Sequence, residues 1–237
     1  MTGGVDYQLG GAYTPPSGVT VVVRDASAEP AAGVYSICYI NGFQTQADQA
    51  SEWTGQHAGL LLHDSKGKVV SDPNWPGEYV LDPSTAANRA GILAIMQPLI
   101  TGCANDGYKA VEFDNLDTFT RFSSIPESGT AALAQAYTAA AHKAGLAAAQ
   151  KNAAEYSRTA HDDWGFDFAI AEECHVYDEC GQYTSVYGQR VVEVEYPDDL
   201  KVSFDSLCSA SDRVPLLVER DRDLVTPSDR GYLRRAC

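Results

Sequence analysis

The sequence predicts a (β/α)₈ barrel. Eight short β-rich runs recur along the chain with helical or loop segments between them, which is the order of parallel strands joined by crossovers. Several runs, VTVVV and VPLLV among them, are apolar at successive positions, as expected of strands buried on both faces. The 237 residues suffice for one such barrel, so we expect residues 1–237 to form a single (β/α)₈ barrel domain.

The strands are assigned from apolar and β-branched runs that end at turn or polar residues. The expected strands are residues 6–9, 19–25, 35–40, 110–115, 147–152, 168–173, 191–196 and 214–220.

Three helices are expected between these strands. The first covers 84–100, because Ser84 or Thr85 can cap it and apolar residues follow at helical spacing. The second covers 129–144 and ends before Gly145, a natural C-cap. The third covers 198–209. Residues 56–82 contain two short β-like pieces and several turn residues, so we expect them to form an excursion after the third strand.

The overall charge restricts the partners. The chain has 32 acidic and 17 basic residues, a net charge of −15, which repels nucleic acid and anionic lipid and favours cationic or neutral partners. Acidity also keeps secreted proteins soluble, and charge alone does not separate the two explanations. No run approaches eighteen apolar residues, so no membrane span is expected.

Six cysteines form an even set, which favours disulfides and an oxidising compartment. We therefore expect a secreted, extracellular protein. The N-terminus has neither the basic nor the apolar segment of a secretory signal, so an export signal is expected to have been removed from this chain.

Polar and acidic residues gather at the C-terminal ends of the predicted strands, which meet on one face of a barrel, where active sites lie. One such residue alone would be the first solvated position of a loop, but several strand ends together predict a site. These residues are Asp25, Asp114, Asn115, Lys151, Asn152, Glu172, Glu173, Glu195, Tyr196, Glu219 and Arg220.

Paired carboxyl groups are what glycosidic cleavage requires, because one protonates the leaving oxygen while the other attacks the anomeric carbon or activates water. Lys151 would supply a countercharge among them. The sequence contains no GxSxG, GxxxxGK[ST] or GxGxxG motif. Its five histidines lack HxH or HExxH spacing, so neither a metal nor a cofactor is expected.

Ordered segments of the chain resemble glycoside hydrolase family 114 over about residues 5 to 196. They are YQLGG, SICYING, WPGEYVLD, AVEFDNLDTF, AHKAGL followed by QKN, DFAIAEECHVYDEC and VEVEY. The resemblance implies a barrel with endo-α-1,4-polygalactosaminidase activity. The catalytic Asp of the family falls on Asp114 and its catalytic Glu on Glu172. By analogy with barrel α-glycosidases, Asp114 would be the nucleophile and Glu172 the acid/base.

Glu173 stands where the family usually has Gln, so Glu172 and its neighbour could be confused. Alternation along a strand points only one of the two into the barrel mouth. Asn115 is expected to orient Asp114. The residues expected to bind substrate around the pair are Asp25, Tyr39, Asn115, Lys151, Asn152, Glu173, Tyr177 and Glu195.

The implied substrate is a galactosaminogalactan-like polysaccharide, cationic at mildly acidic pH, which a negatively charged chain would attract. We expect a monomer. The resemblance and the spacing support a Cys174–Cys180 disulfide, with Cys208–Cys237 following; Cys38 and Cys103 could bridge or stay buried thiols. Two alternatives stay open: a non-catalytic carbohydrate-binding barrel, and a hydrolase of another amino-sugar or neutral polysaccharide.

Overall fold

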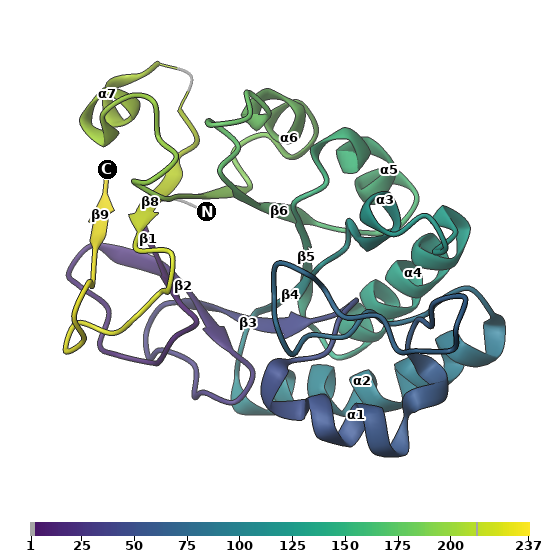
Figure 1. Cartoon of the computed structure of the whole chain (residues 1–237). Coiled ribbons are helices and arrows are strands. Elements are labelled where there is room, and N and C mark those ends of the chain that lie inside the picture. Colours follow the sequence, from purple (N-terminus) through teal and green to yellow (C-terminus); the bar gives the residue numbers. More distant parts are fainter. Residues whose placement is uncertain (1–2, 212) are drawn as a thin grey trace.

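The computed structural model describes residues 3–211 and 213–237, and it confirms the predicted barrel (Figure 1). Eight strands pair in sequence order, each parallel to the next, and the predicted strand ends lie within two residues of the observed ones. A short strand that was not predicted, β9 (Arg234–Ala236), pairs antiparallel with β8. The parallel strands are β1 (Gly4–Gln8), β2 (Val19–Asp25), β3 (Tyr35–Asn41), β4 (Ala110–Asp114), β5 (Ala147–Lys151), β6 (Phe168–Glu172), β7 (Val191–Glu195) and β8 (Leu216–Arg220).

Strand β1 lies against β8 and β9 and nearly closes the barrel. Two arginine side chains bind carbonyl groups of β1 at this seam: Arg220 donates to Tyr7 O, and Arg234 Nη2 donates to Val5 O at 2.9 Å. These bonds satisfy backbone acceptors of β1 that would otherwise stay open at a sheet edge.

Helices cover the outer face of β3 to β8 (Figure 1). They are α1 (Ala50–Gln56), α2 (Ala86–Asp106), α3 (Thr118–Arg121), α4 (Glu127–Lys143), α5 (Ser157–Asp162), α6 (Cys180–Tyr187) and α7 (Phe204–Ser209), with 3₁₀ turns at Ala47–Gln49, Ala58–Leu60 and Ala154–Tyr156. Loops replace the helices after β1 and β2. The loop after β2 covers that strand by packing Ala31 and Val34 against Val22.

The predicted helices are present with shifted ends. Helix α2 begins after Thr85, whose side chain accepts from Asn88 N, and it continues to a left-handed cap at Gly107. Helix α7 is shorter than predicted and begins after Ser203, whose side chain accepts from Ser206 N. Asp198 and Asp199, at the expected start, lie before it and form ion pairs with Arg222. Helices α1, α3, α5 and α6 were not predicted, since they are too short for a periodic apolar pattern.

Residues 57–82 form the predicted excursion after β3, held by isolated antiparallel bridges such as Leu61–Leu81 and Ser71–Tyr79. Three disulfides are present: Cys38–Cys103, Cys174–Cys180 and Cys208–Cys237. The first resolves the open alternative in favour of a bridge, which ties β3 to α2.

The core has two layers, and alternation along the strands decides which side chain enters which layer. The barrel interior contains Tyr7, Tyr39, Ala110, Val194 and Tyr196 among other apolar residues. A larger layer between the barrel and the helices contains the side chains of opposite parity. At the C-terminal ends of the strands, the side chains that point into the barrel are mostly polar.

Candidate functional site

Lys151 lies at the centre of the barrel mouth. Its side chain, only 2 % exposed, points inward from β5, and its Nζ contacts acceptors from three other strands. Nζ lies 3.2 Å from Glu112 Oε1, 3.4 Å from Asp114 Oδ1, 3.2 Å from Glu172 Oε2 and 3.1 Å from the Tyr7 hydroxyl. One ammonium group therefore joins three carboxylates.

Asp114, at the end of β4, is held by neighbours on both oxygens. The Tyr39 hydroxyl donates to Oδ2 at 2.7 Å, and the backbone N–H of Asn115 donates to Oδ1 at 2.7 Å. Asn115 itself has a left-handed backbone, with φ 62°. Its side chain donates to Asn41 Oδ1 at 2.9 Å and accepts from Arg121 at 2.8 Å. The orientation of Asp114 thus depends on the backbone of Asn115, which its side-chain bonds hold in place.

Glu172, at the end of β6, is held in a similar way. The Tyr196 hydroxyl donates to Oε1, and Asn152 Nδ2 donates to Oε2 at 3.4 Å. Asn152 Oδ1 also accepts from the Glu172 backbone N–H at 2.9 Å. Arg222 stacks on the Tyr196 ring at 4.5 Å, so the loop after β8 supports the tyrosine that binds this carboxylate.

The two carboxyl groups are close together. Asp114 Oδ1 and Glu172 Oε2 contact the same nitrogen, so their separation cannot exceed the sum of the two distances, 3.4 and 3.2 Å. Both side chains stay partly exposed, at 19 % and 26 %, whereas Lys151 beneath them is buried. The pair is open to a ligand from the side facing solvent.

Burial sets the protonation of the groups around the pair. It raises the pKa of Tyr7, Tyr39 and Tyr196, so their hydroxyls stay protonated as donors. The surrounding carboxylates raise the pKa of Lys151 despite its burial, so it stays cationic. Burial also raises the pKa of Glu112 to about 7, although Lys151 acts in the opposite direction.

Three predicted residues point away from the mouth, because their strand parity is the outer one. Glu219 on β8 accepts from Arg235 at 3.3 Å. Glu173 binds Arg222, with Oε1 at 2.9 Å from Nη2, so of the adjacent pair only Glu172 enters the barrel. Glu195 is completely buried on the outer side of β7, where it accepts from the His175 backbone N–H at 2.9 Å. The inward residue is its neighbour Tyr196. Tyr177 lies on the loop between β6 and α6, and its side chain is 63 % exposed.

Glu193 and Glu195 form a buried acidic pair behind β7. Burial and the neighbouring Glu195 raise the pKa of Glu193, and burial raises the pKa of Glu195. A carboxyl group with a raised pKa binds its proton more tightly in the folded than in the unfolded chain. The free energy of unfolding therefore falls as pH rises above the ordinary glutamate pKa of 4.5 towards the raised values.

We therefore expect the Tm of the wild-type protein to fall between about pH 5 and pH 9. Glu193→Gln should flatten this decline, since an amide keeps the shape of the protonated acid and does not ionise. Thermal unfolding followed by circular dichroism across this range measures both slopes. If Tm fell equally with pH in the two proteins, ionisation of Glu193 would not be the cause of the decline.

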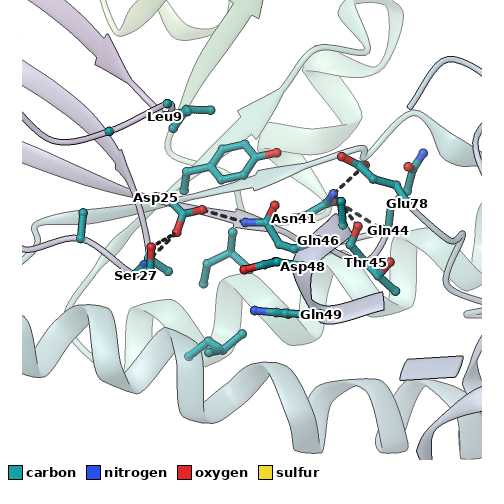
Figure 2. Close-up of a pocket in the computed structure, with 18 of the residues that line it drawn as sticks. Leu9, Asp25, Ser27, Asn41, Gln44, Thr45, Gln46, Asp48, Gln49 and Glu78 are labelled. Atoms are coloured by element: carbon teal, nitrogen blue, oxygen red, sulfur yellow. Dashed lines mark hydrogen bonds between the residues drawn. The ribbon is translucent and has the colours of Figure 1, made fainter. Parts of the chain in front are cut away.

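A cavity of about 590 Å³ opens beside the pair, on the side of β1 to β3. Figure 2 shows Asp25, Asn41, Gln46, Asp48 and Glu78 around it. Gln46 donates to Asp25 at 2.7 Å, and Asn41 donates to Glu78 at 3.0 Å. None of its lining residues is a lysine or arginine. Tyr39 lines the cavity and also binds Asp114, so the cavity adjoins the carboxyl pair.

Burial raises the pKa of Glu78 to about 7, and Asp114 is among the groups that raise it. Asn41 connects the two regions, because it binds both Glu78 and Asn115.

The sequence reasoning found five residues that the structure brings to the mouth: Asp114, Glu172, Lys151, Tyr39 and Asn152. It named Tyr196 as a strand-end residue without a separate role, and it missed Tyr7 and Glu112; the inner parity of their strands brings all three to the same mouth. Counting two residues back from Asp114 would have found Glu112. It also missed Asn41 and Glu78, because no pattern of strand ends in the sequence predicts that these two residues lie close together.

Among the described residues, one group of three potential metal ligands is close enough to share an ion: Cys174, Cys180 and Glu193. Its two sulfur atoms are joined in a disulfide and so offer no thiolate. No helix in the described part of the chain has both the length and the apolar character of a membrane span.

Comparison with known proteins gives matches of two kinds. The family model of glycoside hydrolase family GH114 matches residues 2–237. A search of curated proteins finds no match.

Several solved structures share the fold. Ega3 of Aspergillus fumigatus, solved in complex with galactosamine, is 19 % identical with a TM-score of 0.76, over 100 % of this chain and 95 % of that chain. The glycoside hydrolase domain of PelA from Pseudomonas aeruginosa is 15 % identical with a TM-score of 0.63, over 94 % of this chain and 96 % of that chain. The α-galactosidase TtGalA of Thermus thermophilus, in complex with stachyose, is 13 % identical with a TM-score of 0.52, over 95 % of this chain and 62 % of that chain.

Proposed function

The chain belongs to glycoside hydrolase family GH114, and from that membership we propose that it cleaves α-1,4-linked galactosamine-containing polysaccharide internally, with Asp114 and Glu172 as the catalytic pair. The enzyme class follows from the family. The observation that carries the assignment of the pair is the Lys151 ammonium group, which contacts both carboxylates at the open end of the barrel.

The distance between the carboxyl groups favours a retaining mechanism. Retaining glycosidases have carboxyl groups about 5 to 5.5 Å apart, whereas inverting enzymes need about 6.5 to 9.5 Å to admit water. The upper limit set by the shared Lys151 contacts only just reaches the lower end of the inverting range.

In this mechanism Glu172 protonates the glycosidic oxygen as Asp114 attacks the anomeric carbon. The glycosidic bond breaks, the leaving part of the polymer departs as an alcohol, and a glycosyl ester forms on Asp114. Glu172, now a carboxylate, removes a proton from water, which attacks the ester and releases Asp114. Tyr39 donates to one Asp114 oxygen, and the Asn115 backbone N–H and Lys151 hold the other, so the carboxylate is oriented before it attacks.

Lys151 supplies a fixed positive charge through this cycle. Before the first step it stabilises the Asp114 carboxylate, and after that step it stabilises the new Glu172 carboxylate. Tyr196 donates to Glu172 and supports the same ionised form.

A cationic substrate is supported by the charge of the cavity. Asp25, Asp48 and Glu78 line it without a basic residue, and the chain has a net charge of −15. An ammonium group at sugar carbon 2 would be attracted to these carboxylates. The similar structure of Ega3 holds galactosamine. The cavity extends to one side of the pair, which suits a chain that continues beyond the cleaved bond.

A secreted location is supported by the three disulfides, which form and persist in oxidising compartments.

Incubation with purified α-1,4-galactosamine polymer tests the proposal. We expect the wild-type protein to release oligosaccharides, measured by reducing ends and mass spectrometry, and Glu172→Gln to release none. A fully N-acetylated polymer should be cleaved more slowly, since it has no ammonium groups. Release from a neutral polymer alone would point to another polysaccharide. Binding without cleavage of any polymer would point to a carbohydrate-binding barrel.

A further inference from the structure

The exposed large apolar side chains lie at one end of the barrel. In the described part of the chain they are those of Trp75, Tyr177 and Val202. Trp75 lies in the excursion after β3, Tyr177 in the loop after β6 and Val202 in the loop after β7. All three loops leave the C-terminal ends of strands, which form the face that carries Asp114 and Glu172. One exposed apolar residue needs no explanation, but the location of all three on this face does.

The two aromatic rings have no partner inside the protein. Trp75 is 55 % exposed, and Tyr177 is exposed to a similar extent. Across the residues that the structure describes, neither the Trp75 indole N–H nor the Tyr177 hydroxyl makes a hydrogen bond, and neither ring pairs with another ring or with a cation. A ring left in water does not contribute the free energy that burial would give, so packing does not explain these two side chains.

The loop of Trp75 is fixed to the end of β4. The Glu78 backbone N–H donates to Trp75 O at 3.1 Å and closes a tight turn. Asp72, three residues before Trp75, is buried and forms an ion pair with Arg121. Arg121 also donates to Asn115 Oδ1 at 2.8 Å. Because Asn115 directly follows β4, Trp75 stands on a loop that is held beside Asp114.

The loop of Tyr177 is fixed to the end of β6. It directly follows Glu172, and the Cys174–Cys180 disulfide closes it. The Tyr177 backbone N–H donates to Glu173 O at 3.1 Å. Loops that are ordered before a ligand arrives lose little entropy when they bind it, so both rings are suited to binding.

We propose that Trp75 and Tyr177 are stacking platforms for two sugar units of the substrate, on opposite sides of the cleaved bond. Their loops follow strands three apart in a ring of eight, so they lie nearly across the mouth from each other. Asp114 and Glu172 lie between them. Val202, which has no ring, is not part of the site.

The chemistry of the substrate suits two aromatic platforms. A sugar of galacto configuration has one face made largely of C–H groups, which packs against an aromatic ring, and an ammonium group at carbon 2 is attracted to the ring face. This inference rests on the proposed function and deepens it. A polymer held on both sides of the carboxyl pair places an internal bond at that pair, which is what internal cleavage requires.

Trp75→Ala and Tyr177→Ala should each raise KM for the galactosamine polymer about tenfold, while kcat stays within about threefold of wild type because neither ring touches the reacting atoms. The double variant should raise KM about a hundredfold, since distant sites act additively. Trp75→Phe keeps a ring and should recover most of the loss. Val202→Ala is the matched control on the same face and should keep the wild-type KM.

A second readout needs no turnover. Trp53 and Trp164, the other two tryptophans, are each 3 % exposed, so the neutral quencher acrylamide reaches mainly Trp75. In Glu172→Gln, a bound galactosamine oligosaccharide should lower the quenching constant by about half, because a stacked sugar covers one of the two ring faces. Trp75→Ala should lose the quenchable emission, which verifies the source of the signal.

The substituted side chains are exposed, so we expect every variant to fold, and thermal unfolding checks this. A wild-type KM in both alanine variants would overturn the proposal, as would unchanged quenching by an oligosaccharide that calorimetry shows to be bound. Failure of the proposed function looks different, because the wild-type protein would then release nothing from the galactosamine polymer. The same variants are in that case measured on the polysaccharide that the wild-type protein does cleave.

Discussion

Replacing Asp114 by Asn should lower kcat on a galactosamine polymer by at least about a thousandfold while the variant still binds the polymer. The amide keeps the size of the side chain and an oxygen to accept from Tyr39, but it is not a nucleophile. The variant should still bind, because the proposed binding surface, the cavity and the outer loops, is left in place by this change. Reducing-end release measures the first effect, and affinity electrophoresis in polymer gels measures the second.

Two further variants make this test specific. Asp25→Asn makes the same chemical change at the end of β2, on the wall of the cavity, and should raise KM while kcat stays within about tenfold of wild type. Asp114→Gly with azide should yield a glycosyl azide of inverted configuration, since azide then takes the place of the nucleophile. Turnover by Asp114→Asn near the wild-type rate would contradict the assignment of Asp114.

Lys151→Met should both inactivate and destabilise the protein. Removing one partner of a buried ion pair costs about 3 to 5 kcal/mol, because the remaining charge is left uncompensated. For a chain of this size such a loss lowers Tm by on the order of 10 °C. The change also removes the ammonium group that contacts both Asp114 and Glu172. Thermal unfolding and the polymer assay measure the two effects.

The double variant Glu112→Gln/Lys151→Met separates the two effects. It removes the deepest anion together with the cation, so it should recover part of the lost Tm but none of the activity. If Lys151→Met alone unfolds at the wild-type temperature, the ammonium group does not hold the cluster together as described.

The order of strands and long helices was predictable because short stretches of sequence determine it. Buried parallel strands need apolar runs such as VTVVV, a capping Thr85 marks where one long helix begins, and Gly145 marks where another has ended. The short helices α3 and α5 were not predictable, since four to six residues carry too little periodicity and the packing of loops decides their form.

The strand-end position of Asp114 and Glu172 was predictable for the same reason. Side chains alternate along a strand, and this alternation brings Glu172 and Tyr196 inward and turns Glu173 and Glu195 outward. Polar character alone had predicted that Glu173 and Glu195 also lie at the mouth. Alternation decides a direction only once strand boundaries are known to within one residue, because a slip of one residue reverses every side chain.

By itself, the sequence determined the barrel, the order of its strands and the two carboxyl groups at its mouth. Only the tertiary structure decided that Lys151 lies between them and that Tyr7 reaches Glu112, residues 105 positions apart in the chain. Such contacts form when eight strands close into a ring, because the stagger and tilt of the strands determine which inward side chains meet at one level. No local pattern contains that closure, and therefore the charges that surround the proposed catalytic pair could be identified only in the folded barrel.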